Sequence, residues 1–281
     1  MHRIVFIVVY VGKYPWYFSY FLHSCQYNPT LDFLIFTDNN VQNYKMPANV
    51  KIIPISIEQF KTKATKALGF EVAIDCGYKL CDFKPAYGYI FSDYIKKYDF
   101  WGYCDVDVIF GNIRSFMTDE LLNEHDVISA RHDYLSGFFA LYRNQTCFRE
   151  MFKQSKDYRK VFTENRNYFF DETNFAFEAV EKGLHYSQIR TEVESMTHVV
   201  KRLQEAKKLK AYFEFIALQG FAGNMLWKKG TLIYRKHYEA LLYHLVEFKL
   251  NYSEPIDLNN IIPEEFRIGK KKIYQTKKNK C

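Results

Sequence analysis

The sequence lacks a transmembrane-length apolar run at its start and lacks cysteine pairs typical of a metal or disulfide framework. Its opening apolar stretch, residues 4–11, is too short to cross a bilayer and is not followed by a small-residue cleavage site. The six cysteines contain no CxxC pair and no Cys/His spacing typical of zinc ligands. These absences favour a cytoplasmic protein with reduced thiols.

Acidic residues are absent from the C-terminal tail, residues 267–281, which carries seven Lys or Arg. Seven equals the formal net charge of the whole chain, +7, so the remainder is balanced. A balanced body without a basic and aromatic recognition motif does not favour nucleic-acid binding. The tail itself is either a solvated chain end or a contact with anionic lipid at the inner face of the membrane.

The chain is rich in aromatic residues, with 26 Phe and 23 Tyr, and 48% of it is hydrophobic, which is ample for a large core. Strand-like and helix-like segments alternate in the first half, which predicts an α/β fold with a mostly parallel sheet. We expect strands at 4–11, 33–36, 51–55, 126–130 and 137–142, and helices at 14–26, 82–97, 115–124, 145–154 and 192–218. A hairpin is expected at 225–235, followed by an apolar segment, 239–250.

The segment WGYCDVDVIFG, residues 101–111, places Asp105 and Asp107 two positions apart at the end of a strand-like run. Side chains at i and i+2 of a strand point to the same face, so both carboxylates can reach one ion. Ionised Asp beside large apolar residues is costly to bury unless a positive partner compensates. Because Mg²⁺ and Mn²⁺ take carboxylate and phosphate oxygens, the pattern predicts a metal site, with a solvated turn as the alternative.

With these residues in place, the chain resembles the GT-A fold glycosyltransferases, which transfer a sugar from a nucleotide diphosphate donor. The resemblance rests on GKYPWYFSYFLHSCQYNPTLDFLIFTD and KPAYGYIFSDYIKKYDFWGYCDVDVIFG, and spans roughly residues 3 to 145. These strings are similar to a bacterial glycosyltransferase-like family linked to surface polysaccharide. The resemblance implies a Rossmann-like, mostly parallel sheet flanked by helices in a domain covering 1–250, and a helical C-terminal extension, 251–281, ending in the basic tail.

The resemblance also implies a set of metal and donor contacts. Asp105 and Asp107 would hold Mn²⁺ or Mg²⁺, Asp105 being shared with the donor, and the late His244 would complete the site, with His237 as a competitor. Ligands of parallel sheets bind at the carboxyl ends of the strands. The strand-end positions that match those holding the nucleoside are Val9, Tyr10, Val11, Gly12, Thr37 and Asp38. The resemblance also places Lys84 and Gly137 near the nucleotide-sugar donor.

The segments SGFFALYRN and FFDETNF also resemble those that GT-A enzymes place around donor sugar and acceptor, which implies that Asp171 and Glu172 are the candidates for contact with an acceptor hydroxyl or for a general base. The alternative for Asp171 is a helix cap over residues 172–182. Lys84 has the alternative of an ordinary surface lysine. Gly137, without a side chain, would let the backbone approach a sugar.

The resemblance therefore implies a metal-dependent hexosyltransferase that uses a nucleotide sugar, with uridine diphosphate as the expected nucleotide. Its acceptor would be a glycan or a lipid-linked glycan. A metal-dependent nucleotidyltransferase or phosphohydrolase is the first alternative, although the sequence lacks a glycine-rich phosphate loop. A non-catalytic sugar-binding module is the second.

Overall fold

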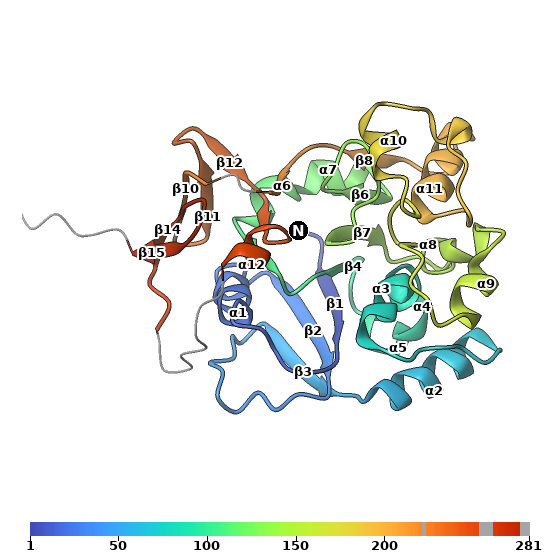
Figure 1. Ribbon diagram of the computed structural model, residues 1–281, viewed down its shortest axis with the longest axis horizontal. Coiled ribbons are helices and arrows are strands. Elements are labelled where there is room, and N and C mark those ends of the chain that lie inside the picture. Colours follow the sequence, from blue (N-terminus) through green and yellow to red (C-terminus); the bar gives the residue numbers. More distant parts are fainter. Residues whose placement is uncertain (221–222, 253–260, 276–281) are drawn as a thin grey trace, which may run out of the picture.

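The computed structural model describes residues 1–220, 223–252 and 261–275. In this part of the chain the strands form sheets of seven, five and three strands. The seven-stranded sheet lies at the centre of the molecule, and the five-stranded sheet projects from one side of it (Figure 1).

The central sheet has the strand order β3-β2-β1-β4-β7-β6-β8 in the described residues. Strands β3, β2, β1 and β4 run parallel, β7 is antiparallel to both of its neighbours, and β8 is parallel to β6. The bounds of these strands are β1 Ile4–Tyr10, β2 Leu31–Thr37, β3 Val50–Pro54, β4 Phe100–Cys104, β6 Val127–Ser129, β7 Phe139–Arg143 and β8 Ala211–Phe213. The predicted α/β class with a mostly parallel sheet flanked by helices is confirmed.

Both faces of the central sheet are buried, as the continuous apolar run of β1 indicates. Val5 and Ile7 belong to the core on one face, whereas Ile4 and Phe6 belong to the core on the other. The helices that contribute to these cores and the remaining helices are α1 Phe18–Gln26, α2 Ile57–Leu68, α3 Leu80–Phe83, α4 Tyr87–Ile90, α5 Ser92–Ile95, α6 Ile113–Phe116, α7 Asp119–Glu124, α8 Thr146–Arg149, α9 Tyr158–Thr163, α10 Phe177–Glu181, α11 Met196–Glu205 and α12 Phe248–Asn251. None of the helices in the described ranges has the length and apolar character needed to span a bilayer.

Several expected helices are divided or shortened in the structure. The expected helix over 115–124 is two short helices, α6 and α7, and the one over 145–154 is α8 followed by a 3₁₀ turn. The expected helix over 82–97 is wrong as one element, because Pro85 cannot donate a backbone hydrogen bond and the chain there forms α3, a 3₁₀ turn, α4 and α5. The expected helix over 192–218 ends at Glu205, since Lys207 has a positive φ of 55°. The chain beyond it pairs as β8 with β6.

The later part of the chain forms two small sheets. The predicted hairpin is confirmed as β10 Met225–Lys228 and β11 Thr231–Tyr234, and β12 Tyr238–Ala240 pairs with β11. The expected helical C-terminal extension is wrong for the described residues 261–275, where β14 Glu265–Ile268 and β15 Ile273–Gln275 continue this sheet. The predicted basic tail therefore begins within β14, and its last residues, 276–281, lie outside the described residues.

The third sheet links two distant segments and positions the candidate site. Strand β13 Leu242–His244 pairs antiparallel with β5 Val108–Phe110, and β9 Ala217–Leu218 pairs parallel with β13. The segment after residue 239, predicted only as apolar, is thereby brought beside the two aspartates.

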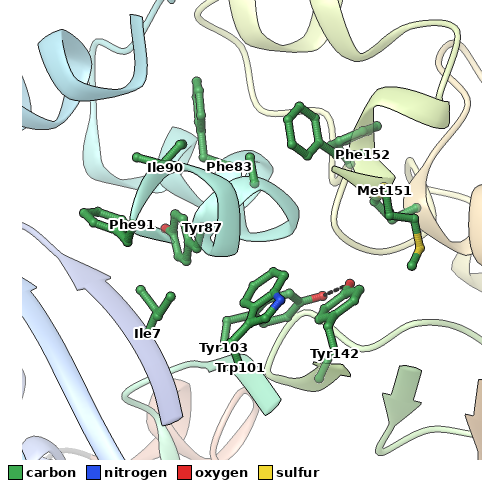
Figure 2. Packing of buried hydrophobic residues seen from close by; sticks show 14 of the residues in the cluster. Ile7, Phe83, Tyr87, Ile90, Phe91, Trp101, Tyr103, Tyr142, Met151 and Phe152 are labelled. Carbon is green, nitrogen blue, oxygen red and sulfur yellow. Dashed lines mark hydrogen bonds between the residues drawn. The ribbon is translucent and has the colours of Figure 1, made fainter. Parts of the chain in front are cut away.

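The aromatic core beneath α4 is tightly packed. Trp101 of β4 stacks on Tyr142 of β7, with ring centroids 4.7 Å apart, and Figure 2 shows both rings below the helical segment that carries Tyr87. Gly88 lies against the same indole, because a Cβ at this position would be 2.3 Å from Trp101 Cε2. The close approach of α4 to β4 therefore requires glycine.

We predict that Gly88→Ala lowers the melting temperature. Overpacking costs about 1–3 kcal/mol, which outweighs a helix-propensity gain of about 1 kcal/mol. Differential scanning calorimetry measures the change, and Gly88→Ala/Trp101→Phe should recover part of it because the clashing ring atoms are gone. A single variant that melts at or above the wild-type temperature would contradict this packing.

Candidate metal and nucleotide site

A cavity of about 320 Å³ lies where β1 and β4 end. This is the edge of a parallel sheet at which ligands of open α/β folds bind. Its wall combines backbone and apolar groups with two carboxylates and two ammonium groups, and consists of Val8, Val9, Tyr10, Val11, Tyr17, Gly77, Tyr78, Leu80, Cys81, Lys84, Tyr87, Cys104, Asp105, Val106, Asp107 and Lys249.

The pairing of β13 with β5 brings His244 to this cavity edge. Asp105 directly follows β4, and Asp107 directly precedes β5. His244 is opposite Val108 in the register, and the N–H of Leu245 donates to the carbonyl of Asp107 at 2.8 Å. Backbone hydrogen bonds thus fix the histidine next to the second aspartate, across more than 130 residues of sequence.

Asp107 is the most strongly compensated charge of the site. Its side chain is 7% exposed, and its Oδ2 lies 3.4 Å from His244 Nε2 and 2.5 Å from Lys249 Nζ. Burial opposes ionisation, but the histidine and the lysine outweigh it, so the pKa of Asp107 lies below its ordinary value. The carboxylate is therefore an anion at neutral pH.

Asp105, Asp107 and His244 each offer one ligand atom, and these atoms lie within 4.8 Å of one another. Two carboxylates and one imidazole suit Mn²⁺ and leave positions for phosphate oxygens and water, so the donor set fits a divalent cation. Among the described residues, the competing His237 is not part of this group and lies exposed between β11 and β12.

Lys84 is a buried bridge between two carboxylates and is not a surface lysine. Its Nζ lies 2.6 Å from Asp105 Oδ1 and 3.4 Å from Asp171 Oδ2, and it donates to the carbonyl of Gly137 at 2.8 Å. Burial lowers the pKa of this ammonium, but the carboxylates outweigh burial, and its pKa lies well above the ordinary value. Lys84 therefore remains a cation beside the first aspartate.

Asp171 and Glu172 lie on the far side of this bridge. Burial raises the pKa of Asp171 well above its ordinary value, against the opposing effect of Lys84. Burial also raises the pKa of Glu172, which accepts a 2.8 Å hydrogen bond from the N–H of Gly137. The alternative of a helix cap is wrong, because α10 begins at Phe177 and Ala176 precedes it.

Gly137 lets the backbone approach the side chains of Asp171 and Glu172, whereas the sequence predicted the approach of a sugar. A Cβ at Gly137 would lie 2.6 Å from Asp171 Oδ2 and 2.9 Å from Glu172 Cγ. The backbone here therefore packs against the two acidic side chains. The chain just before β7 is thereby in contact with the acidic turn, the turn that carries Asp171 and Glu172.

The residues predicted to contact the nucleoside divide into two groups. Val9, Tyr10 and Val11 form part of the cavity wall. Gly12, Thr37 and Asp38 are not part of that wall and lie at the adjoining ends of β1 and β2, where Tyr10 pairs with Thr37. Here the N–H of Gly12, whose φ is 91°, donates to Asp38 Oδ1 at 2.9 Å.

The structure adds three residues that the sequence reasoning missed. Lys249 lies on Asp107, and Gln219 contacts His244 Nδ1 at 2.9 Å. Arg131 donates to the Oε1 of Gln219 at 2.6 Å. Lys249 could have been found from the sequence, because it follows His244 by five positions in the same segment. Gln219 and Arg131 belong to no local sequence pattern that would have indicated them.

The chain belongs to a family of unknown function, DUF6625, whose model matches residues 6–277. No curated protein matches the sequence significantly. Among solved structures, the chain is similar to galactosyltransferase LgtC in complex with donor and acceptor sugar analogs, at 11% identity and a TM-score of 0.40, covering 77% of this chain and 76% of that one.

A second similar structure is the apo form of glycosyltransferase GlyE from Streptococcus pneumoniae TIGR4. The identity is 12% and the TM-score 0.38, covering 76% of this chain and 45% of that one. Likenesses of this degree do not establish a shared activity.

We predict that Lys84→Met destabilises the protein by about 3–5 kcal/mol, because it leaves a buried carboxylate without its cation. Chemical denaturation measures the loss. The variant Lys84→Met/Asp171→Asn should be more stable than Lys84→Met, since the uncompensated charge is removed as well. Wild-type stability of Lys84→Met would show that the bridge is not needed by the fold.

Proposed function

We propose that this protein is a metal-dependent glycosyltransferase, a hexosyltransferase that moves a sugar from a nucleoside diphosphate, with uridine as the expected nucleoside. The acceptor is a glycan or a lipid-linked glycan in surface polysaccharide synthesis. The observation that supports this best is the cluster of Asp105, Asp107 and His244 at a cavity that also contains two lysines. Such a site suits a divalent cation together with an anionic diphosphate.

Asp105, Asp107 and His244 would hold Mn²⁺ or Mg²⁺. When bound, the cation would offset the negative charge that develops on the departing diphosphate. The protein's own part is to place an ammonium group beside each carboxylate, Lys84 beside Asp105 and Lys249 beside Asp107. The cavity wall at the end of β1 would hold the nucleoside.

We propose that the ammonium group of Lys249 binds the diphosphate. Its ammonium is bound to Oδ2 of Asp107, a carboxylate that would also bind the cation. Two positive groups on one carboxylate repel each other, so metal binding would release Lys249 toward the nearest anion. Its side chain is 30% exposed and forms part of the cavity wall, where the phosphates would lie.

Asp171 and Glu172 are proposed as the acceptor side of the site. A carboxyl group with a raised pKa is a stronger base when ionised, which suits removal of a proton from an acceptor hydroxyl. Asp171 is 2% exposed and bound to Lys84, whereas Glu172 is less deeply buried. Glu172 is therefore the better candidate for direct contact.

The two alternatives differ in what they do with a nucleotide. A phosphohydrolase or nucleotidyltransferase would turn over nucleotide phosphates without a sugar acceptor, and a sugar-binding module would ignore the nucleotide. Contact of the basic tail with the inner face of the membrane stays a prediction.

We predict that Asp107→Ala abolishes Mn²⁺-dependent binding of uridine diphosphate, because it removes a ligand. Calorimetry with and without Mn²⁺ measures this, and Asp93→Ala, an exposed carboxylate on α5, is the control that should bind as wild type. Unchanged Mn²⁺-dependent affinity in Asp107→Ala would sink the proposed metal site.

We predict opposite effects of Lys249→Met on two ligands. Affinity for Mn²⁺ alone should rise, because the competing ammonium is gone, whereas affinity for uridine diphosphate in saturating Mn²⁺ should fall about 10-fold, the effect of losing about 1.4 kcal/mol of charge-assisted hydrogen bonding. Lys66→Met, an exposed lysine on α2, controls for net charge. If both affinities fall together, Lys249 supports the fold of the site and does not compete with the metal.

A further inference from the structure

A row of hydrogen-bonding side chains lies behind the proposed metal site. Arg131 Nη1 donates to Gln219 Oε1 at 2.6 Å, and the Gln219 amide nitrogen lies 2.9 Å from His244 Nδ1. The other ring nitrogen, His244 Nε2, lies 3.4 Å from Asp107 Oδ2. The row therefore reaches from Arg131, which is outside the ligand group, to two of its members.

Arg131 determines how the Gln219 amide is turned. A guanidinium has only donors, so the amide atom that faces it must be the oxygen. Arg131 is itself held firmly, because its Nε donates to Asp133 Oδ1 at 2.8 Å and its Nη2 to Asp133 Oδ2. Its side chain is 11% exposed and also lies 3.4 Å from Glu181. The nitrogen of the Gln219 amide is consequently turned toward His244.

This orientation determines which imidazole nitrogen carries the proton. The amide NH₂ group can only donate, so His244 Nδ1 must accept with its lone pair. A neutral imidazole then carries its proton on Nε2, the atom that faces Asp107. The ring of Phe138 stacks on the imidazole with centroids 4.4 Å apart and helps to hold its plane. In this arrangement Nε2 has no lone pair to offer a metal.

We propose that Gln219 is a positioning residue that opposes metal ligation by His244 until its amide rotates. The inference rests on the proposed function, because it requires His244 Nε2 to bind the ion. Ligation needs the proton on Nδ1, and an Nδ1–H would meet the donor end of the amide. Rotation of the amide presents its oxygen to Nδ1–H and turns its nitrogen toward Arg131, which breaks the Arg131 hydrogen bond.

Replacing Gln219 by a side chain with acceptors only tests this role. In Gln219→Glu one carboxylate oxygen can accept from Arg131 and the other from His244 Nδ1–H. We expect its Mn²⁺ affinity, measured by calorimetry, to be about 10-fold higher than that of wild type, the usual scale for partners of metal ligands. Gln219→Leu, which lacks the opposing donor, should fall between the two.

Two controls separate this effect from added charge. In a His244→Ala background the gain from Gln219→Glu should disappear, and nitrogen NMR of the metal-free protein with neutral imidazole should find the His244 proton on Nε2 in wild type and on Nδ1 in Gln219→Glu. A gain that persists without His244, an affinity no higher than wild type, or a wild-type proton on Nδ1 would overturn the inference. Wild-type Mn²⁺ affinity in Asp107→Ala would instead refute the proposed metal site, and the metal-free spectrum would still test the amide orientation.

Discussion

The buried carboxylate of Asp107 is the constraint on which the arrangement of the site depends. An anion this deep in the protein needs compensating partners, and the fold supplies the ammonium group of Lys249 and the ring N–H side of His244 from a segment far along the chain. The pairing of β13 with β5 places His244 beside Asp107, because it aligns His244 with Val108. The same ladder that completes the small sheet therefore also brings together the residues proposed to bind the metal.

Lys84 extends this charge arrangement to the other half of the site. It joins Asp105, at the end of β4, to Asp171, in the acidic turn before α10, and it also binds the backbone at Gly137. Three separate segments thus meet at one ammonium group. The proposed metal side and the proposed acceptor side share this contact. A change of charge on one side therefore changes the electrostatic potential at the other.

The sequence predicted the features that depend on residues close together along the chain. The apolar run of β1 predicted the sheet and the aspartates after β4 predicted two members of the candidate metal site, because strand periodicity and carboxylate spacing are visible over a few residues. The helix over 82–97 was wrong because Pro85 divides it, and the helical C-terminal extension was wrong over its described residues 261–275 because β14 pairs with β10 there. Gln219 was not predictable, because its role depends on contacts with Arg131 and His244, 88 and 25 residues away.

The most direct test of the account is a crystal structure with Mn²⁺ and uridine diphosphate, with the ion located by its anomalous scattering. The account predicts one Mn²⁺ bound by Asp105, Asp107 and His244, with the Lys249 ammonium moved from Asp107 to a phosphate oxygen. An anomalous peak elsewhere, with Lys249 still paired to Asp107, would contradict it.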